Sequence, residues 1–346
     1  MTTLQDDDLY LHAGRAAGKV LIITGAGNGI GREVAIKFAQ LGAKVVIGDL
    51  DVTGAEKTAE DIKAAGGQAT AVKVNVTNWD DQCRLFEVAQ STYGSVDIVI
   101  PNAGIGESGR FGLVKFEDGK PVQPNLFTLD VNLKGALYTA HLAQHYMITT
   151  EKKEGDLKSI VFMGSMASWV ALPGSVQYAA SKHSILGAMR SLSLPLKAQG
   201  VRVACIHPFF AETAMISPRE RLMFAGIPLT PMARIVGAIV NAATDPNLNT
   251  TGAAYVLPDN GLTFRVSQEF FTLGIYGLIN KRVGWFKTVG TVFYFINIAK
   301  DVRKALIGRK ATFALTFLAA WFAWRRTGLS QVIRPLISSY VQQRRR

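Results

Sequence analysis

The chain has 346 residues, of which 48% are hydrophobic and 18% are charged, which excludes a disordered or low-complexity chain. Its two cysteines, Cys83 and Cys205, exclude a disulfide framework and lack metal-ligand spacing, so we expect both to be reduced core residues of a cytosolic protein. The acidic N-terminus has no apolar run before the first predicted strand, which argues against a secretory signal.

The net charge of +12 is concentrated near the C-terminus. Residues 265–346 hold 15 basic and two acidic residues, whereas residues 1–264 hold 23 basic and 24 acidic ones. We therefore place a boundary near residue 264. This gives an N-terminal extension over residues 1–17, a main domain over residues 18–264, and a basic, apolar, helical tail over residues 265–346.

The main domain opens with a predicted strand, a turn, a helix and a second strand. Val20–Ile23 is a short apolar run, Ile30–Leu41 has helical apolar spacing, and Val45–Ile47 is β-branched. The turn contains four glycines, which let a ligand approach the backbone closely: Gly25, Gly27, Gly29 and Gly31. Such a βαβ unit indicates a dinucleotide site, with the pyrophosphate over the helix N-terminus.

Asp49 ends the second strand, 18 residues beyond Gly31. A carboxylate there accepts hydrogen bonds from the adenosine ribose hydroxyls and repels a 2′-phosphate. Asn28 stands in the turn where a basic side chain could have paired with that phosphate. We therefore expect NAD as the cofactor rather than NADP, and we interpret the neighbouring Asp51 as a loop acid.

Strand and helix patterns alternate through the rest of the main domain. The later apolar strand patterns lie within residues 69–77, 96–104, 159–166 and 201–210. This alternation predicts an α/β fold of the Rossmann type, a doubly wound parallel sheet with helices on both faces.

Tyr178 and Lys182 lie four residues apart at the head of an apolar helical segment, so both side chains can reach one site. A phenol is a poor base unless a nearby positive charge favours the phenolate form. Taken alone, the pair would suit a packed tyrosine beside a solvated lysine equally well.

Five motifs occur in an order that resembles the short-chain dehydrogenase/reductase family. They are Thr24-Gly25-(x)3-Gly29-Ile30-Gly31, Asn102-Ala103-Gly104, Asn132, Ser165 and Tyr178-(x)3-Lys182, with Ser165 placed 13 residues before Tyr178. The resemblance covers about residues 18–262. It implies a Rossmann fold and an NAD-linked enzyme that moves a hydride between a substrate carbon and the nicotinamide ring.

The resemblance also implies four catalytic roles. Tyr178 would exchange a proton with the substrate oxygen, while Lys182 would favour the phenolate and hold the nicotinamide ribose. Ser165 would hydrogen-bond the substrate oxygen. Asn132 would keep a water in the proton relay, unless its side chain only bonds the backbone.

The cofactor-binding positions follow from the same motifs. They are Gly25, Asn28, Gly29, Ile30, Gly31, Asp49, Asn75, Val76, Asn102, Ala103, Gly104, Tyr178, Lys182, Pro208, Phe210 and Thr213. Three positions depart from the family pattern. Pro101 replaces a second asparagine, and the bulky Phe209 follows Pro208 where glycine is common. Asn75 replaces an aspartate that usually meets the adenine, and its amide can still hydrogen-bond the exocyclic amine.

The histidines indicate no metal site. His141 and His145 lie one helical turn apart, but no third ligand is apparent. We interpret His183 and His207 as structural residues.

Two segments after strand ends are candidates for the substrate site, residues 106–125 and residues 214–235. The second contains Met215, Ile216, Leu222, Met223, Phe224 and Ile227. An apolar lid favours a lipophilic secondary alcohol or ketone, such as a terpenoid, steroid, prostanoid or other lipid-like compound. Alternatively, these residues form a subunit contact in a homo-oligomer. A similarity to hydroxyprostaglandin-type dehydrogenases favours oxidation, with carbonyl reduction as the alternative.

The tail matches nothing in the family core. Its apolar, aromatic stretches at residues 284–299 and 311–324 are flanked by basic residues, and the second has 14 residues, short of the roughly 20 that span a bilayer. Trp321, Trp324 and nearby arginines suit a membrane interface. We expect attachment to the cytosolic face of a membrane, such as the endoplasmic reticulum or a lipid droplet, and otherwise a cytoplasmic protein.

Two alternatives remain for the tail. It could be a helical extension that covers the active site or a neighbouring subunit. It could also bind nucleic acid, but its long apolar runs argue against that. The rival to an enzyme is a non-catalytic NAD-binding scaffold anchored by the tail, and the intact catalytic set counts against it.

Overall fold

The computed structural model describes residues 1–109, 111–148, 156–211, 225–271, 294–298 and 321. The chain divides into two compact units, Met1–Phe270 and Phe271–Arg346, and the fold below is that of the first unit. Among the described residues, no helix is both long enough and apolar enough to cross a bilayer. Most of the C-terminal tail lies outside the described residues, and so does its expected membrane attachment.

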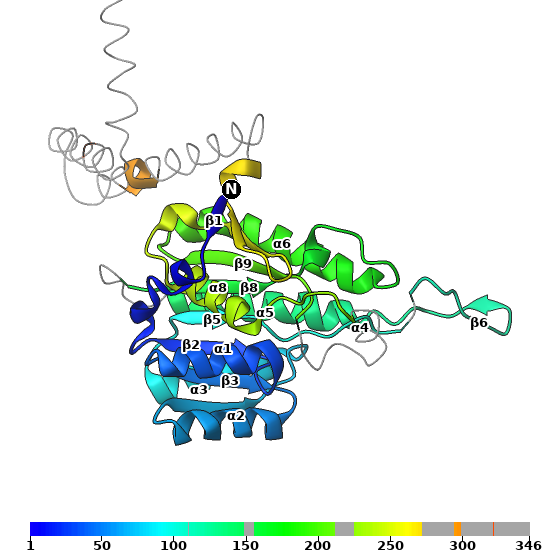
Figure 1. Ribbon diagram of the computed structural model, residues 1–346, viewed down its shortest axis with the longest axis horizontal. Helices are drawn as coiled ribbons and strands as arrows, with labels where there is room; N and C mark the ends of the chain where they lie inside the picture. Colours follow the sequence, from blue (N-terminus) through cyan, green and yellow to red (C-terminus); the bar gives the residue numbers. More distant parts are fainter. Residues whose placement is uncertain (110, 149–155, 212–224, 272–293, 299–320, 322–346) are drawn as a thin grey trace, which may run out of the picture. The chain divides into compact units, whose positions relative to one another are not determined.

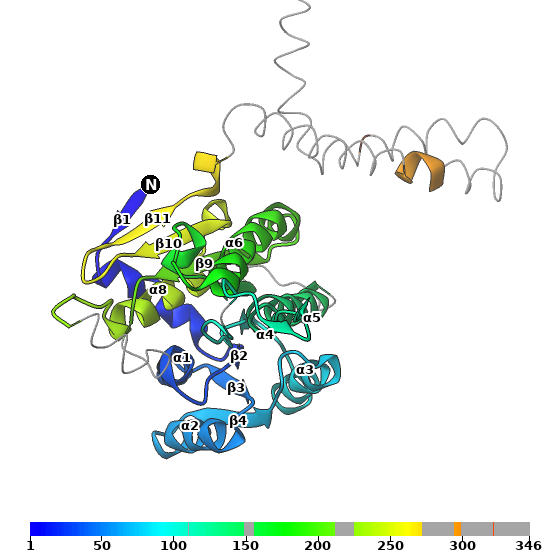
Figure 2. The same cartoon turned by 90° about the vertical axis from the view of Figure 1, so that its right-hand side faces the viewer.

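A nine-stranded sheet forms the centre of the first unit, in the order β1-β11-β10-β9-β8-β5-β2-β3-β4 (Figures 1 and 2). The seven strands from β10 to β4 in that order run parallel, and β11 and β1 add an antiparallel edge. The strands are β1 (Thr2–Leu4), β2 (Val20–Thr24), β3 (Lys44–Asp49), β4 (Gln68–Lys73), β5 (Ile98–Ile100), β8 (Ser159–Met163), β9 (Arg202–Pro208), β10 (Ala253–Leu257) and β11 (Thr263–Val266).

Helices cover both faces of this sheet (Figure 2). One apolar core is shared with α1, α2 and α8, and a second core with α3, α5 and α6. These helices are α1 (Gly29–Gln40), α2 (Val52–Ala64), α3 (Trp79–Tyr93), α5 (Ala136–Ile148), α6 (Val176–Lys197) and α8 (Met232–Thr244). The Rossmann-type fold predicted from the sequence is therefore confirmed.

Shorter elements fill the connections between the strands and the main helices. They are the 3₁₀ helices η1 (Asp7–Tyr10), η2 (Ala13–Ala16), η4 (Met166–Ser168), η5 (Leu248–Thr250) and η6 (Gln268–Phe271), the short helix α4 (Phe127–Leu129), the π-helix η3 (Asp130–Gly135), and the strands β6 (Phe116–Glu117) and β7 (Lys120–Pro121).

The strand order reverses between β2 and β5, which are neighbours in the sheet. The chain first builds outward through β3 and β4, then returns to β5 and continues the other way through β8, β9 and β10. The crevice outside the carboxyl ends of strands at such a reversal is where doubly wound sheets bind ligands. The topology therefore places a ligand site above the ends of β2 and β5.

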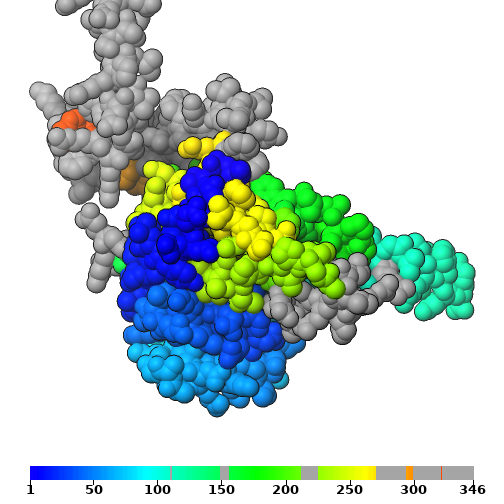
Figure 3. All heavy atoms as spheres, in the orientation of Figure 1, coloured from blue at the N-terminus to red at the C-terminus, as the bar shows by residue number. Residues whose placement is uncertain are grey.

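The N-terminal segment is part of the sheet and of its core. β1 pairs antiparallel with β11, and Figure 3 shows the start of the chain beside the residues just before position 270. Leu9 and Ala16 are fully buried in the apolar core beneath α8. Asp6 pairs with Arg234 of α8 at 2.8 Å. The segment that the sequence suggested as an extension thus completes one edge of the main domain.

The first candidate substrate segment, residues 106–125, leaves the main domain as a projecting hairpin (Figures 1 and 3). Its strands β6 and β7 are joined through Asp118 and Gly119, whose positive φ values of 51° and 74° suit a tight hairpin turn. Apolar side chains along the hairpin are exposed, namely Phe111, Leu113, Val114 and Phe116. Only the root of this segment can contribute to a site in the main domain.

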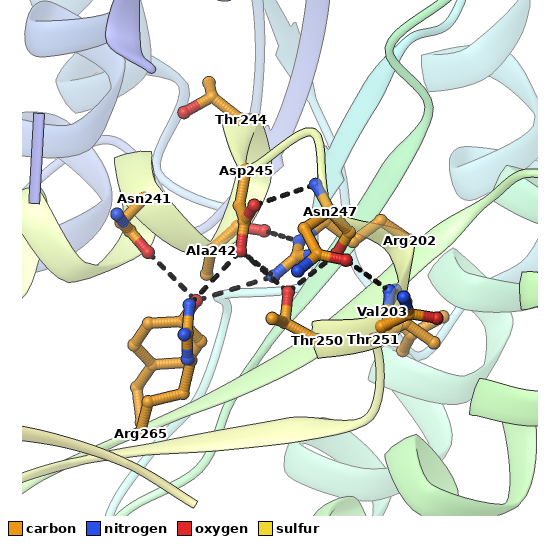
Figure 4. Close-up of polar contacts among 12 residues, drawn as sticks. Arg202, Val203, Asn241, Ala242, Thr244, Asp245, Asn247, Thr250, Thr251 and Arg265 are labelled. Carbon is orange, nitrogen blue, oxygen red and sulfur yellow. Dashed lines mark hydrogen bonds and ion pairs between the residues drawn. The ribbon is translucent and has the colours of Figure 1, made fainter. Parts of the chain in front are cut away.

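A buried ion-pair network joins β9, β11 and the end of α8 (Figure 4). Arg202, at the start of β9, lies 3.3 Å from the carboxylate of Asp245 and donates to the main-chain oxygens of Ala242 and Asn247. Thr250 also donates to Asp245, at 2.7 Å. Burial acts to raise the pKa of Asp245, but this hydrogen bond and the charge of Arg202 hold it below its usual value. The network therefore depends on an ionised Asp245.

We expect Asp245→Asn to lower the free energy of unfolding by about 3 kcal/mol, because it leaves the guanidinium of Arg202 buried without its counter-charge. Urea unfolding at pH 7 measures the change. The matched control is Asp61→Asn, which breaks a surface pair with Arg32 at 2.8 Å and should change stability by less than about 1 kcal/mol. Equal losses in both variants would contradict this assignment.

Candidate active site

A cavity of about 490 Å³ lies at the carboxyl ends of the parallel strands. It brings together nearly all the site residues predicted from the sequence. Those in its wall are Gly25, Asn28, Gly29, Ile30, Gly31, Asp49, Asn75, Val76, Asn102, Ala103, Gly104, Ser165, Tyr178, Lys182, Pro208 and Phe210. Asn132 lies behind the wall, and Thr213 lies outside the described residues.

The glycine-rich turn after β2 is pressed against the loop after β5. Gly25 has a φ of 68°, and a Cβ added there would lie 2.6 Å from the Cα of Ala103. A Cβ at Gly31 would collide with the carbonyl oxygen of Gly25 and with Asn102. The side-chain amide of Asn102 donates to the carbonyls of Thr24 and Gly25, at 2.9 and 2.8 Å. The turn therefore leaves backbone, not side chains, at the N-terminus of α1, which suits a pyrophosphate.

Asp49 lies in the cavity wall at the end of β3. Its carboxylate accepts hydrogen bonds from the backbone N–H of Gly27 at 2.7 Å and of Asp51 at 3.0 Å. These bonds fix the carboxylate and leave further lone pairs for hydroxyl donors. Asp51 instead caps α2 by accepting from the N–H of Gly54 and does not line the cavity, so Asp49 is the acid placed for ligand contact.

Ser165, Tyr178 and Lys182 come together at the other end of the site. Ser165 Oγ accepts from the N–H of Ala167 at 3.2 Å, so its own proton is available as a donor. The Nζ of Lys182 lies 5.6 Å from the ring centre of Tyr178 and donates to the carbonyl of Met163 at 2.9 Å. No described residue hydrogen-bonds the Tyr178 hydroxyl. The site thus offers a hydroxyl donor, a phenol and a neighbouring cation.

Asn132 sits in the π-helix η3 and is only 2% exposed. Its Oδ1 accepts from the N–H of Ile105 at 2.8 Å, and its Nδ2 donates to the carbonyl of Ile105 and to Ser181. Three of the four hydrogen-bonding positions of the amide are therefore occupied. These contacts anchor the loop after β5 to α6.

Asn75 lines the cavity beyond the end of β4 and is half-buried. Its Oδ1 accepts from both the N–H and the hydroxyl of Thr77, at 3.0 and 2.8 Å. The oxygen that was expected to accept from an adenine amine is therefore already committed, and the amide nitrogen remains.

Glu107 is a cavity residue that the sequence reasoning missed. Its carboxylate accepts from the N–H groups of Gln177 and Tyr178, at 3.2 and 2.9 Å, and so caps the N-terminus of α6. Glu107 lies 70 or more residues from these partners, so no local capping pattern could have revealed it. It fixes the helix turn that carries Tyr178 and adds a negative charge to the cavity wall.

His207 holds the loop that carries Ser165. Its Nδ1 bonds the carbonyl of Ser165 at 3.1 Å, which requires the proton on that nitrogen. The ring is fully buried, and burial lowers the pKa of His207 to about 3. The residue is thus a neutral imidazole that ties the end of β9 to Ser165, in agreement with a structural role.

The comparisons with known proteins agree with this site. The family model described as short chain dehydrogenase matches residues 19–222. The cyclohexanol dehydrogenase of Acinetobacter sp. (strain SE19) is 30% identical over 246 residues, which cover 69% of this chain and 93% of that protein. The L-rhamnose 1-dehydrogenase (NAD(P)(+)) of Azotobacter vinelandii is 33% identical, over 70% of this chain and 96% of that protein.

Among solved structures, the 3-ketoacyl-(acyl-carrier-protein) reductase from Brucella melitensis complexed with NADH is 27% identical and superposes with a TM-score of 0.62. The match covers 71% of this chain and 98% of that one. The chain belongs to the short-chain dehydrogenase family, as its motifs indicated. It is an NAD(P)-dependent oxidoreductase that acts on alcohols or ketones.

Because the folded-state pKa of His207 lies below the unfolded value of about 6.5, the unfolded chain takes up this proton first as the pH falls. The free energy of unfolding should therefore decrease as the pH falls from about 6.5 toward 3. Protonation of this histidine in the unfolded chain should account for about 2 kcal/mol of the decrease between pH 7 and pH 5. Urea unfolding at both pH values measures the decrease. His207→Asn should lose this part of the dependence, and His183→Asn, at an exposed histidine, should retain it. An unchanged dependence in His207→Asn would refute the assignment.

Proposed function

We propose that this protein is an NAD-preferring dehydrogenase that oxidises a lipophilic secondary alcohol to the ketone. One observation supports this proposal most directly. The hydroxyl of Ser165, the phenol of Tyr178 and the ammonium group of Lys182 line the same cavity as the glycine-rich turn and Asp49. Reduction of the corresponding ketone is the reverse reaction at the same site.

The residues of the cavity fit a bound nicotinamide dinucleotide. The glycines at the start of α1 lie in the cavity wall, where they present backbone to a pyrophosphate, and the fixed carboxylate of Asp49 offers acceptors for ribose hydroxyls. When bound, the cofactor supplies the hydride acceptor or donor.

The chain's own groups would handle the proton and orient the substrate. Ser165 would donate its hydroxyl proton to the substrate oxygen and so orient the reacting carbon. Tyr178, as phenolate, would accept the proton of the substrate hydroxyl during oxidation, and the positive charge of Lys182 stabilises that anion. The bond from Lys182 to the carbonyl of Met163 keeps the ammonium group near the phenol and leaves its other N–H donors for the ribose.

A preference for NAD is supported by the charges in the cavity wall. Among the described lining residues, Lys182 is the only base, and it is held beside Tyr178. Arg32, on the first turns of α1, is paired with Glu33 at 2.7 Å and with Asp61 at 2.8 Å. A 2′-phosphate would therefore meet the carboxylate of Asp49 without a compensating cation from these residues.

A neutral, lipophilic substrate is supported by the rest of the wall. Apolar side chains line it, among them Phe127, Met166, Val170, Leu172, Phe209 and Phe210. The one further charge among the described lining residues is the carboxylate of Glu107, which would repel an anionic substrate. The similarity to a cyclohexanol dehydrogenase supports a cyclic secondary alcohol, whereas the similarity to an L-rhamnose dehydrogenase keeps sugars in the test panel.

The first experiment is NADH formation with NAD and a panel of cyclic alcohols, sterols, terpenoid alcohols and sugars. We expect turnover with the lipophilic members and a loss of at least about 100-fold in Tyr178→Phe, because the proton acceptor is removed. Tyr138→Phe, outside the cavity wall, is the matched control and should keep full activity. Turnover of sugars alone would refute the substrate class, and binding of NADH without turnover in either direction would favour a scaffold.

Replacement of Asp49 by asparagine should reduce the preference for NAD over NADP by about tenfold or more, because it removes the charge that repels the 2′-phosphate. The measurement is kcat/KM with each cofactor. Asp51→Asn removes the same charge two residues away, outside the cavity wall, and should leave the ratio unchanged. Equal use of both cofactors by the wild-type chain would contradict the proposed preference.

We also propose that the tail predicted over residues 265–346 attaches the enzyme to the cytosolic face of a membrane, on the basis of its basic and aromatic sequence. A chain that ends at residue 271 keeps the whole of the first compact unit. It should move from the membrane pellet to the supernatant on fractionation and retain its turnover. Recovery of the full-length chain in the supernatant would refute the attachment.

A further inference from the structure

The helix α6 is not capped by its own N-cap residue. That residue is Ser175, and serine is among the residues that most often cap a helix by accepting from the N–H groups of its first turn. Here the side chain of Ser175 makes no capping bond. The carboxylate of Glu107 accepts from those N–H groups instead, from Gln177 at 3.2 Å and from Tyr178 at 2.9 Å. The fold therefore does not use the hydroxyl of Ser175.

This unused hydroxyl belongs to a residue of the cavity wall. Ser175 is half-buried, and its hydroxyl has no hydrogen-bond partner among the residues that the structure describes. The proposed function assigns the other polar side chains of the described wall to the dinucleotide or to the reacting oxygen, with the exception of Glu107. Ser175 and Glu107 are therefore polar groups of the cavity for which the reaction itself gives no role.

Ser175 lies close to the reacting centre. It stands three residues before Tyr178 at the start of α6, a spacing that puts two side chains on one face of a helix with about 5–6 Å between their Cβ atoms. Both residues line the same cavity. A substrate whose reacting oxygen lies at Tyr178 can therefore present another part of its carbon skeleton to Ser175.

We propose that Ser175 is a specificity-determining residue that binds a second hydroxyl group of the substrate, so that the preferred lipophilic alcohol is a diol. The inference rests on the proposed function, in which Ser165 and Tyr178 hold the reacting oxygen. A serine hydroxyl both donates and accepts, so it matches another hydroxyl in either sense. Each carboxylate oxygen of Glu107 keeps a further lone pair beside it, which favours a donor and disfavours a second carboxylate.

The test compares kcat/KM with NAD for cyclohexanol and for the 1,2-, 1,3- and 1,4-cyclohexanediols, which differ in the separation of their hydroxyls. We expect the wild-type chain to prefer at least one diol over cyclohexanol by about fivefold or more, the effect of one net hydrogen bond. In Ser175→Ala this ratio should fall by about fivefold. Ser184→Ala removes the same group from an exposed position of α6, outside the cavity wall, and should keep the wild-type ratio.

Glu107→Ala tests why the hydroxyl of Ser175 is unused by the fold. Loss of the carboxylate leaves the N–H groups of Gln177 and Tyr178 without an acceptor, and Ser175 can then cap the helix itself. The diol ratio should fall in this variant too. Adding Ser175→Ala to Glu107→Ala should then change the ratio by less than about twofold, because the two residues act as one unit.

Three results would overturn the inference while leaving the proposed function intact. They are turnover of cyclohexanol with no preference for any diol, an unchanged ratio in a folded Ser175→Ala variant, and independent effects of Ser175→Ala and Glu107→Ala. Turnover of neither cyclohexanol nor any diol would instead refute the proposed function, and this inference with it. Circular dichroism and the melting temperature establish that each variant is folded.

Discussion

The active site depends on the close contact between the turn after β2 and the loop after β5. These two strands are neighbours at the reversal of strand order, and their following backbones approach so closely that Gly25 and Gly31 tolerate no side chain. The amide of Asn102 joins the two segments by donating to the carbonyls of Thr24 and Gly25. Because the ends of β2 and β5 are held together, the backbone beneath the crevice is fixed in place. Asp49, at the end of the neighbouring strand β3, is therefore held at a fixed distance from the glycine-rich turn.

Contacts between loops also position Tyr178 and Lys182. The helix α6 is held to the loops that follow sheet strands by polar contacts with main-chain groups. Glu107 accepts from the N–H of Tyr178, Asn132 links Ile105 to Ser181, and Lys182 donates to the carbonyl of Met163. The phenol and the ammonium group are therefore positioned by the ends of β5 and β8, not by the helix alone. A change at any of these anchors would move Tyr178 relative to Ser165.

Much of this arrangement could be predicted from the sequence because spacing determines it. Short-range spacing in the sequence was enough to predict the glycine turn, Asp49 and the Tyr178–Lys182 pair. Residues of all three line the cavity. Glu107 could not be predicted, because its partners on α6 are about 70 residues away. The strand Thr2–Leu4 is too short to show a period and buries only Leu4. The bond from the N–H of Thr77 to the Oδ1 of Asn75 spans two residues, a spacing that a turn pattern could have indicated.

The pairing of β1 with β11 sets an order for folding during synthesis. Thr2, Thr3 and Leu4 lie opposite Arg265, Phe264 and Thr263, so β1 cannot pair until β11, near the end of the main domain, has been synthesised. Until then, the facing edges of β1 and β10 lack the strand that lies between them. Contacts between such distant parts of a chain form slowly. Unpaired strand edges that stay exposed in the meantime are prone to aggregation. Nascent chains stalled before residue 263 should therefore be the species that chaperones bind.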